Sequence, residues 1–363
     1  MILTYKVKHE RDFSNELSKA LKVAKFAIRT KSRSSKDVKH LGLKSMISNQ
    51  VLKKYSKNKK CKSIHSVKLT IPNQGIKVDQ EKRIINIPCV KLKLNYNFPN
   101  NFTKVNQIEI DNKYCYISCE FVDKPEIQVE NYIGVDRNTT GHIAVVANVS
   151  TGKVHKLGKK AYHVHRKYKK IRAHLQSKGA KKKLKKISKR EKNIIKDINH
   201  KTSRKIVEIA TQNKCGISLE DLKGIRKGKK NSKKNKTGES FKSSINSWEF
   251  YQLQTMIEYK AKICGIPLVY VDPKYTSQKC SRCGLIAKNN RKGKNYTCTQ
   301  CGHVDHADAN AAFNIAALAF QDNSMSNDQS ITDRDVMEGS TDTPQLETQQ
   351  RSLETKVREL ALA

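Results

Sequence analysis

The sequence predicts an α/β protein that begins with a small β-barrel interrupted by helices and later carries a zinc ribbon. Three observations carry this prediction. Residues 12–55 have helical periodicity and lie between a short alternating strand at 4–8 and a strand-rich region at 67–122. Strands and helices then alternate from residue 132 to residue 271. Two Cys-x-x-Cys pairs follow, at residues 280–283 and 298–301.

The first expected domain covers residues 1–130, with a helical insert at about 12–58. Apolar residues in the insert recur at helical spacing along one face: Leu17, Leu21, Val23, Ala24 and Ala27. Around residues 67–71, 89–94 and 114–116 the apolar period changes to two, which is typical of short strands separated by polar turns. A strand, a helical insert and further strands together favour an interrupted barrel.

The charge of the chain points to a polyanionic partner. Its 363 residues include 73 Lys and Arg against 33 Asp and Glu, a net charge of +40. Such charge predicts salt-dependent, sequence-independent phosphate binding. Residues 156–205 hold 21 basic residues and 2 acids around an apolar helical stripe, which predicts a basic helical hairpin. The alternative is a solvated lysine face on a purely structural helix.

Two further segments have unusual composition. Residues 226–236 hold seven basic residues in eleven and are expected to form a mobile basic loop. Residues 321–363 hold nine acids against four basic residues and are expected to be a disordered tail. Tyr162, Tyr168 and Trp248 could stack on bases, although packing is the commoner role of isolated aromatic residues near helices.

Composition also excludes several classes of protein. No run of about 18 apolar residues occurs, so no membrane span is expected. The first residues lack a signal-peptide core, and ten cysteines in such a chain are expected to be thiols or metal ligands instead of disulfides. The sequence therefore indicates an intracellular nucleic-acid protein.

The paired cysteines predict a structural zinc site. Each Cys-x-x-Cys turn supplies two thiolates, and 14 residues separate the two pairs, as in a zinc ribbon. Four thiolates complete the tetrahedral shell, so neither His303 nor His306 is expected to bind the ion. The predicted zinc ligands are Cys280, Cys283, Cys298 and Cys301.

Three acids stand at unusual places in this basic chain. Asp136 and Glu220 each end an apolar strand, and Asp308 opens a helix-forming segment. A buried carboxylate is costly unless it is paired or binds a cation, and carboxylates are the ligands that Mg²⁺ and Mn²⁺ prefer. Three converging acids could hold two ions about 4 Å apart for phosphodiester hydrolysis. The pattern alone leaves Asp221 and Asp305 open as alternatives to Glu220 and Asp308.

These motifs occur together, in an order found in a known family. The segments are Ile-Gly-Val-Asp ending at Asp136, Ser-Leu-Glu-Asp-Leu-Lys from 218, Tyr-Thr-Ser-Gln-Lys-Cys-Ser-Arg-Cys-Gly from 275, and Cys-Gly-His-Val-Asp-His-Ala-Asp-Ala-Asn-Ala-Ala from 301. Over about residues 131–318 the chain resembles the TnpB (OrfB) proteins of insertion sequences. That family is related to type V CRISPR effectors.

The resemblance implies a RuvC-like nuclease domain with an RNase H-like fold. Its first part would cover residues 131–273, a zinc ribbon residues 274–304, and the last acid with its helix residues 305–320. The N-terminal domain would be a wedge-like barrel with a helical recognition insert. The resemblance assigns Asp136, Glu220 and Asp308 to catalytic Mg²⁺, or Mn²⁺, and favours them over Asp221 and Asp305.

The implied activity is that of a transposon-encoded RNA-guided DNA endonuclease with a two-metal mechanism. Its partners would be a transposon-derived guide RNA and target DNA with a short flanking motif, in the cytoplasm of a prokaryotic host and associated with the nucleoid. One alternative is an unguided transposase-associated protein that uses the same acids. The other is an RNA-guided DNA-binding regulator that has lost cleavage, against which the three intact acids argue.

Overall fold

The structure is a computed structural model that describes residues 1–58, 61, 63–222 and 250–328, with the side chains of the last helix described up to residue 320. The chain divides into two compact units, Met1–Asp123 and Lys124–Ala363, where the sequence predicted a boundary at 130. The predicted loop at 226–236, Trp248 and the chain beyond residue 328 lie outside the described residues. No helix within the described residues is both long and apolar enough to cross a membrane.

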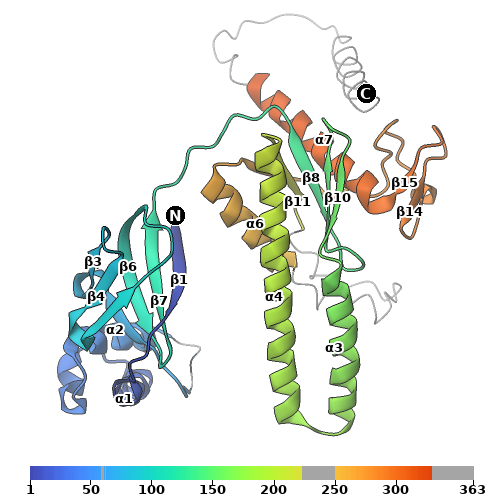
Figure 1. Ribbon diagram of the computed structural model, residues 1–363. Coiled ribbons are helices and arrows are strands. Elements are labelled where there is room, and N and C mark those ends of the chain that lie inside the picture. The colour runs from blue at the N-terminus through green and yellow to red at the C-terminus, as the bar shows by residue number, and fades with distance from the viewer. Residues whose placement is uncertain (59–60, 62, 223–249, 329–363) are drawn as a thin grey trace, which may run out of the picture. The chain divides into compact units, whose positions relative to one another are not determined.

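The first unit contains the expected strand, helical insert and further strands (Figure 1). Its elements are β1 (Ile2–Lys8), α1 (Ser14–Thr30), the 3-10 helix η1 (Ser35–Leu41), α2 (Ser45–Ser56), β2 (Leu69–Pro72), η2 (Asn73–Gly75), β3 (Lys77–Asp79), β4 (Ile84–Ile87), η3 (Pro88–Val90), β5 (Leu92–Asn95), β6 (Phe102–Ile110) and β7 (Tyr114–Phe121).

The strands of the first unit form two sheets and no closed barrel among the described residues. One sheet has the order β1-β7-β6-β2 and the other the order β3-β4-β5. Alternate residues of β7, including Cys115, Ile117 and Cys119, are fully buried in one core that also receives the apolar face of α1. The alternation was therefore interpreted correctly as strands. The predicted barrel is not confirmed, because β3–β5 pair only with one another.

The second unit contains the alternating strands and helices. Its elements are β8 (Tyr132–Arg137), β9 (Ala144–Asn148), β10 (Val154–Leu157), α3 (Lys160–Ser177), α4 (Lys181–Gln212), β11 (Gly216–Glu220), α6 (Phe250–Cys264), β12 (Leu268–Val271), η4 (Lys288–Asn290), β13 (Arg291–Lys292), β14 (Asn295–Thr297), β15 (Val304–His306) and α7 (Ala307–Asp328). The last helix thus runs past residue 321, where the sequence predicted that the disordered tail begins.

A five-stranded mixed sheet forms the centre of the second unit, with the order β10-β9-β8-β11-β12. β9 runs antiparallel to β8 and β10, whereas β8, β11 and β12 are mutually parallel. One face packs against α4 and α6 through Ile133, Val135, Ile217 and Leu219, and the other face packs against α7 (Figure 1). Both faces are covered, which explains why the strands are continuously apolar.

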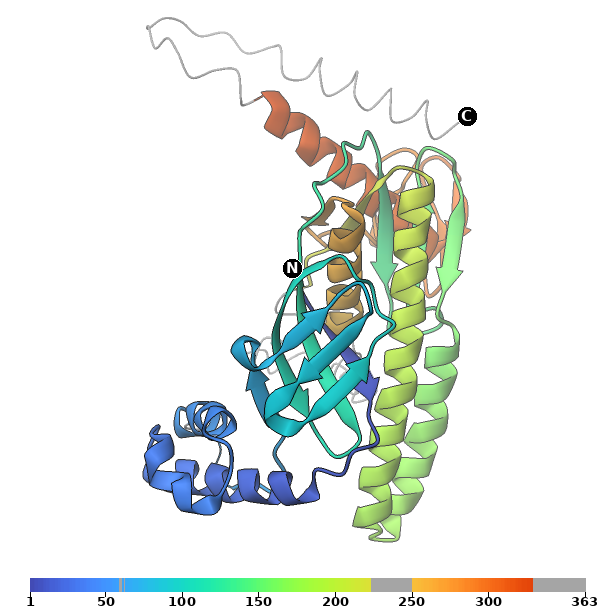
Figure 2. The ribbon, with the colours of Figure 1, turned by 60° about the vertical axis from the view of Figure 1, so that its left-hand side comes forward.

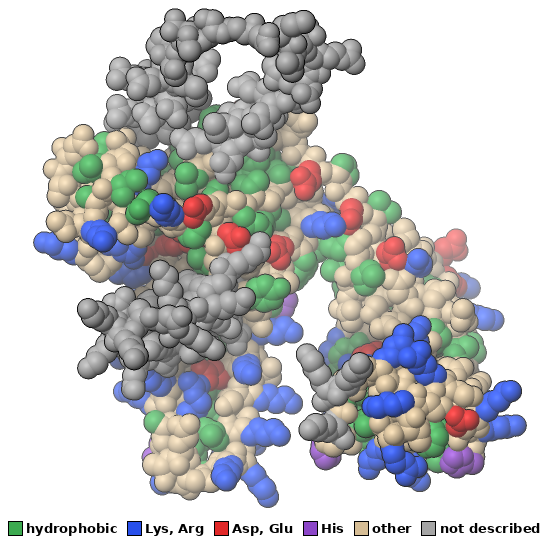
Figure 3. All heavy atoms as spheres, turned by 180° about the vertical axis from the view of Figure 1, so that it is seen from behind, with side chains coloured by type: hydrophobic (Ala, Val, Ile, Leu, Met, Phe, Trp, Pro, Cys, Tyr) green, Lys and Arg blue, Asp and Glu red, His purple; other side chains and the backbone are tan. Residues whose placement is uncertain are grey.

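The predicted basic hairpin is confirmed as α3 and α4, two long helices that lie side by side (Figure 2). Its one buried acid, Glu191, accepts a hydrogen bond from His165 Nδ1 at 3.1 Å and forms an ion pair with Arg172, so it joins the two helices. Tyr168 is 7% exposed, so little of its ring is accessible for stacking on bases. Lys and Arg side chains line the solvent-facing sides of the hairpin (Figure 3).

Candidate active site

Two of the predicted acids lie side by side at one edge of the sheet. β8 and β11 are parallel neighbours, and Val135 is paired with Leu219, so Asp136 and Glu220 follow at the same end of both strands. Each acid is only 8% exposed. Arg137, the next residue of β8, joins the two strand ends by donating to the Glu220 carbonyl oxygen at 2.5 Å. The sequence pattern did not predict this contact.

The third acid reaches the same edge because α7 lies very close to the sheet. A Cβ atom on Gly134 would lie 1.9 Å from the Ala312 carbonyl oxygen and 2.5 Å from the Ala316 nitrogen. The Ser218 hydroxyl donates to the Ile315 carbonyl oxygen at 2.8 Å and fixes the helix over β11. Asp308, in the first turn of this helix, is 1% exposed. Glycine two residues before Asp136 is therefore a packing requirement.

The three acids act on one another electrostatically. Burial, followed by the charges of Glu220 and Asp308, raises the pKa of Asp136 to about 7. Burial also raises the pKa of Glu220, against the opposing effects of the Thr276 hydroxyl and of Arg137 and Arg291. Because desolvation and the charges of the other two acids oppose ionisation of Asp136, and desolvation opposes ionisation of Glu220, a cation at this edge would stabilise the site.

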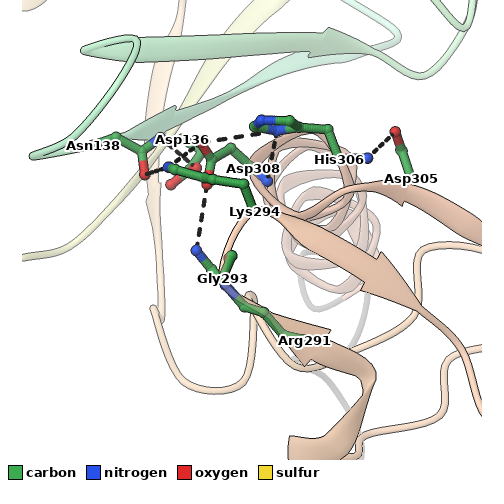
Figure 4. Close-up of polar contacts among 8 residues, drawn as sticks. All are labelled: Asp136, Asn138, Arg291, Gly293, Lys294, Asp305, His306 and Asp308. Carbon is green, nitrogen blue, oxygen red and sulfur yellow. Dashed lines mark hydrogen bonds and ion pairs between the residues drawn. The ribbon is translucent and has the colours of Figure 1, made fainter.

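Two basic residues from the region between the cysteine pairs lie against Asp308 (Figure 4). Lys294 Nζ is 2.5 Å from Asp308 Oδ2 and 3.5 Å from Asn138 Oδ1, and an Arg291 guanidinium nitrogen is 3.4 Å from Asp308 Oδ1. The Asn138 amide in turn donates to Asp136 at 2.8 Å. Neither basic residue was predictable from the sequence, because lysines and arginines are common everywhere in this chain.

The two alternative acids take other positions. Asp221 lies beyond the end of β11 and is more exposed than Glu220, and its backbone nitrogen donates to the Val271 carbonyl oxygen at 2.9 Å. Asp305 lies in β15, before α7 begins, and accepts from the His306 backbone nitrogen at 2.6 Å (Figure 4). Neither residue appears among the charges that raise the pKa of Asp136.

The four predicted zinc ligands converge. Their sulfur atoms all lie within 4.8 Å of one another, with Cys280 to Cys301 at 3.7 Å and Cys283 to Cys298 at 3.5 Å. A tetrahedron with Zn–S bonds of about 2.3 Å has sulfur–sulfur edges of about 3.8 Å, so the spacing fits zinc. Neither His303 nor His306 belongs to this group. The cysteine cluster that the sequence predicted is confirmed.

The acids are arranged more loosely than the cysteines. Within the part of the chain that the structure describes, the cysteines are the only such group of three or more candidate ligands that are all this close together. The carboxylates are instead held by neighbouring donors, with Lys294 on Asp308 and Thr276 on Glu220. The fold and site thus define an α/β protein with a buried acidic edge and an adjoining four-cysteine ribbon.

Comparison with known proteins confirms the family resemblance. Residues 250–315 match the family model "Cas12f1-like, TNB domain". The CRISPR-associated endodeoxyribonuclease Cas12f1 of Sulfoacidibacillus thermotolerans is 43% identical over 120 residues, which cover 32% of this chain and 26% of that protein. The TnpB-like protein MJ0751 of Methanocaldococcus jannaschii is 35% identical over 158 residues, covering 42% of this chain and 55% of that protein.

A longer match reaches into the first half of the chain. InsQ of Escherichia coli K12, whose naming as an RNA-guided DNA endonuclease is provisional, is 27% identical over 266 residues, covering 67% of this chain and 64% of that protein. A solved Cas12f1-sgRNA-target DNA complex covers 87% of this chain and 99% of that chain at 17% identity, but its TM-score of 0.42 is too low to support an argument. The matched region spans about a quarter of the length of the Cas12f relatives.

Proposed function

We propose that this protein is an RNA-guided DNA endonuclease of the TnpB type, whose RuvC-like domain cleaves phosphodiester bonds with divalent metal ions. The observation that carries the proposal is the convergence of Asp136, Glu220 and Asp308 at one buried edge of the sheet. The similarity to Cas12f1 and TnpB-like proteins supports the same function. The match to the family model, at residues 250–315, includes the ribbon and the first part of α7.

The donor set at this edge fits Mg²⁺ or Mn²⁺. Three carboxylates are hard oxygen ligands, and their burial without a divalent cation is compensated only in part by Lys294 and Arg291. Such ions, when bound by these acids, would activate water and stabilise the leaving oxygen in a phosphodiester hydrolysis. The protein's own part is to hold the carboxylates at fixed strand and helix ends and to bring Arg291 and Lys294 toward an approaching phosphate.

The nucleic-acid partners proposed are a transposon-derived guide RNA and a target DNA with a short flanking motif. The support is the net charge of +40 and the basic hairpin of α3 and α4 (Figure 3). Lysines on this surface would contact phosphates and set the salt dependence of binding instead of base choice. Sequence specificity would come from base pairing of the guide.

The first experiment sequences the RNA that copurifies with the protein when it is expressed beside its native flanking DNA. One dominant RNA, with a constant folded region and a 3′ end that runs past the element boundary, is expected. Fragments of abundant cellular RNA alone would contradict guided targeting and favour the unguided alternative. The guide so identified is then used to program cleavage of a matched DNA.

The second experiment tests the acids in that cleavage assay. Asp136→Ala should abolish cleavage while guide RNA still binds, because the acid contributes to the proposed metal site and not to the hairpin surface. Asp197→Ala, on the exposed side of α4, is the matched control and should cut normally. Equal cutting rates for Asp136→Ala and wild type would exclude this site, and a wild type that binds guide and target without cutting would favour the regulator.

A further inference from the structure

A threonine that precedes the first cysteine pair contacts one of the acids. Thr276 is 3% exposed, and its Oγ1 atom lies 2.6 Å from Glu220 Oε1. An ionised carboxylate only accepts hydrogen bonds, so the hydroxyl is the donor. The Pro273 carbonyl oxygen, at 3.1 Å, is the other acceptor within reach, but the shorter contact is with Glu220.

Two asparagines of α7 hold the segment that carries this threonine. The Asn314 side-chain amide donates to the carbonyl oxygens of Thr276 at 2.8 Å and Lys279 at 2.7 Å. Asn310 donates to the Lys279 carbonyl oxygen at 2.8 Å and accepts from the Ser281 backbone nitrogen at 2.9 Å. Both asparagines are at most 3% exposed, so these hydrogen bonds offset the cost of burying their amides.

The asparagines share a helix with the third acid. Residues 310 and 314 are four apart, so they lie on one face of α7, and Asp308 lies in the first turn of the same helix. Most of their neighbours in this part of the helix are alanines that pack on the sheet. α7 therefore places Asp308 directly, and through residues 276–281 it also fixes the donor that contacts Glu220.

We propose that Thr276 is a positioning residue for Glu220, held in place by Asn310 and Asn314. The proposal rests on the metal-binding role of the acids set out above and deepens it. A glutamate side chain has three rotatable bonds, and a donor fixed on Oε1 selects one orientation and leaves the second oxygen free for a cation. Outer hydrogen-bond partners of this kind typically change metal affinity about 10- to 100-fold.

Mn²⁺ binding to the purified full-length protein, measured by electron paramagnetic resonance without nucleic acid, tests this proposal. Thr276→Val keeps the shape of the side chain and removes the hydroxyl, and it should weaken Mn²⁺ binding about tenfold or more. Thr276→Ser keeps the hydroxyl and should remain within about threefold of wild type. Thermal unfolding is followed alongside to confirm that both variants fold.

Two controls separate the possible explanations. Thr70→Val changes a buried threonine of the first unit, whose hydroxyl has no hydrogen-bond partner among the described residues, and should leave Mn²⁺ binding unchanged. Asp136→Ala should remove Mn²⁺ binding at the acids. If Asp136→Ala abolishes binding while folded Thr276→Val binds as wild type does, the positioning role is wrong and the proposed function stands.

The remaining outcomes are equally decisive. A Ser variant as weak as the Val variant would assign the effect to packing and overturn the role of the hydroxyl. If Asp136→Ala itself leaves Mn²⁺ binding unchanged, the acids do not form the proposed metal site, and both proposals fall together.

Discussion

At the scale of single residues, Asp136 is a group that the fold destabilises in its charged form. Its pKa of about 7 in the folded protein lies above the ordinary value of 3.8, because of burial and the neighbouring acids. Between about pH 4 and pH 7 the folded state therefore holds a proton that the unfolded chain has lost. The stability of the folded protein falls as pH rises through this window. Above it, the full free-energy cost of the buried Asp136 charge is present.

Asp136→Asn should consequently stabilise the protein at pH 8 in the absence of divalent metal. Removing the charge should raise the free energy of unfolding by roughly 2 to 4 kcal/mol and the Tm by roughly 5 to 10 °C, with a smaller gain at pH 5. Calorimetry at both pH values checks this, with Asp197→Asn as the exposed control. A lower Tm for Asp136→Asn at pH 8 would show that the charged carboxylate does not destabilise the folded protein.

Lys294 is positively charged, unlike the acids, and it is expected to weaken metal binding where they support it. Its ammonium group lies 2.5 Å from Asp308 Oδ2, where it competes with any cation for that oxygen. Lys294→Met should therefore tighten Mn²⁺ binding about tenfold, equivalent to about 1.4 kcal/mol. Isothermal titration calorimetry measures the change, and Lys292→Met, at an exposed residue of β13 two positions earlier, should have no effect. Weaker binding by Lys294→Met would mean that the lysine supports the site instead of competing.

The role of a residue was predictable from the sequence where its type is unusual for its position in the chain. Four cysteines in two close pairs point to zinc in any fold, and an acid at the end of an apolar strand is conspicuous. The choice of Glu220 over Asp221 came from the family resemblance. Thr276 and Lys294 could not be predicted, because their roles depend on contacts with residues 56 and 14 positions away that only the fold creates.

At the scale of elements, the contact between β8 and α7 determines whether two of the acids can meet. Gly134→Ala would place its Cβ 1.9 Å from a helix carbonyl oxygen, a clash that only a displacement of α7 can relieve. We expect a loss of stability of about 3 kcal/mol, at the upper end for overpacking, together with loss of cleavage because Asp308 moves with the helix.

Denaturant unfolding and the cleavage assay check this prediction together. Gly152→Ala is the control, since its Cβ meets no atom within 4 Å and only the positive φ of 65° opposes it. If Gly134→Ala unfolds at the same denaturant concentration as wild type, the close approach of α7 is not a constraint in solution.

Most elements of the second unit followed from sequence periodicity, because the central strands β8, β9 and β11 are buried throughout and the helices are long. The first unit was harder. Period two identified strands such as β7, but it did not predict which strands pair or that β3–β5 pair only with one another. The pattern of one strand fixes the face that it buries, whereas strand order depends on the turns and on long-range packing.

At the scale of the whole molecule, the ribbon contains the four cysteines and also contacts two of the acids, Glu220 and Asp308. The segment before the cysteine pairs supplies Thr276 to Glu220, and the segment between them supplies Lys294 and Arg291 to Asp308. Met1–Asp123 is a separate compact unit with a hydrophobic core of its own. The metal content of the ribbon should therefore affect the acids but leave the first unit intact.

Zinc removal should accordingly disable cleavage without unfolding the protein. We expect the purified chain to hold one zinc ion, and Cys301→Ser to lose it, because three thiolates hold zinc less tightly than four. Hydrogen exchange should then accelerate over residues 276–306 and leave β6 and β7 protected, while Mn²⁺ binding weakens as the contact of Thr276 with Glu220 loosens. Cys264→Ser, an exposed cysteine outside the cluster, is the control and should behave as wild type. A zinc-free variant that still binds Mn²⁺ and cuts at the normal rate would show that the ribbon and the acids fold independently, and the structural connection through Thr276 would then have no functional role.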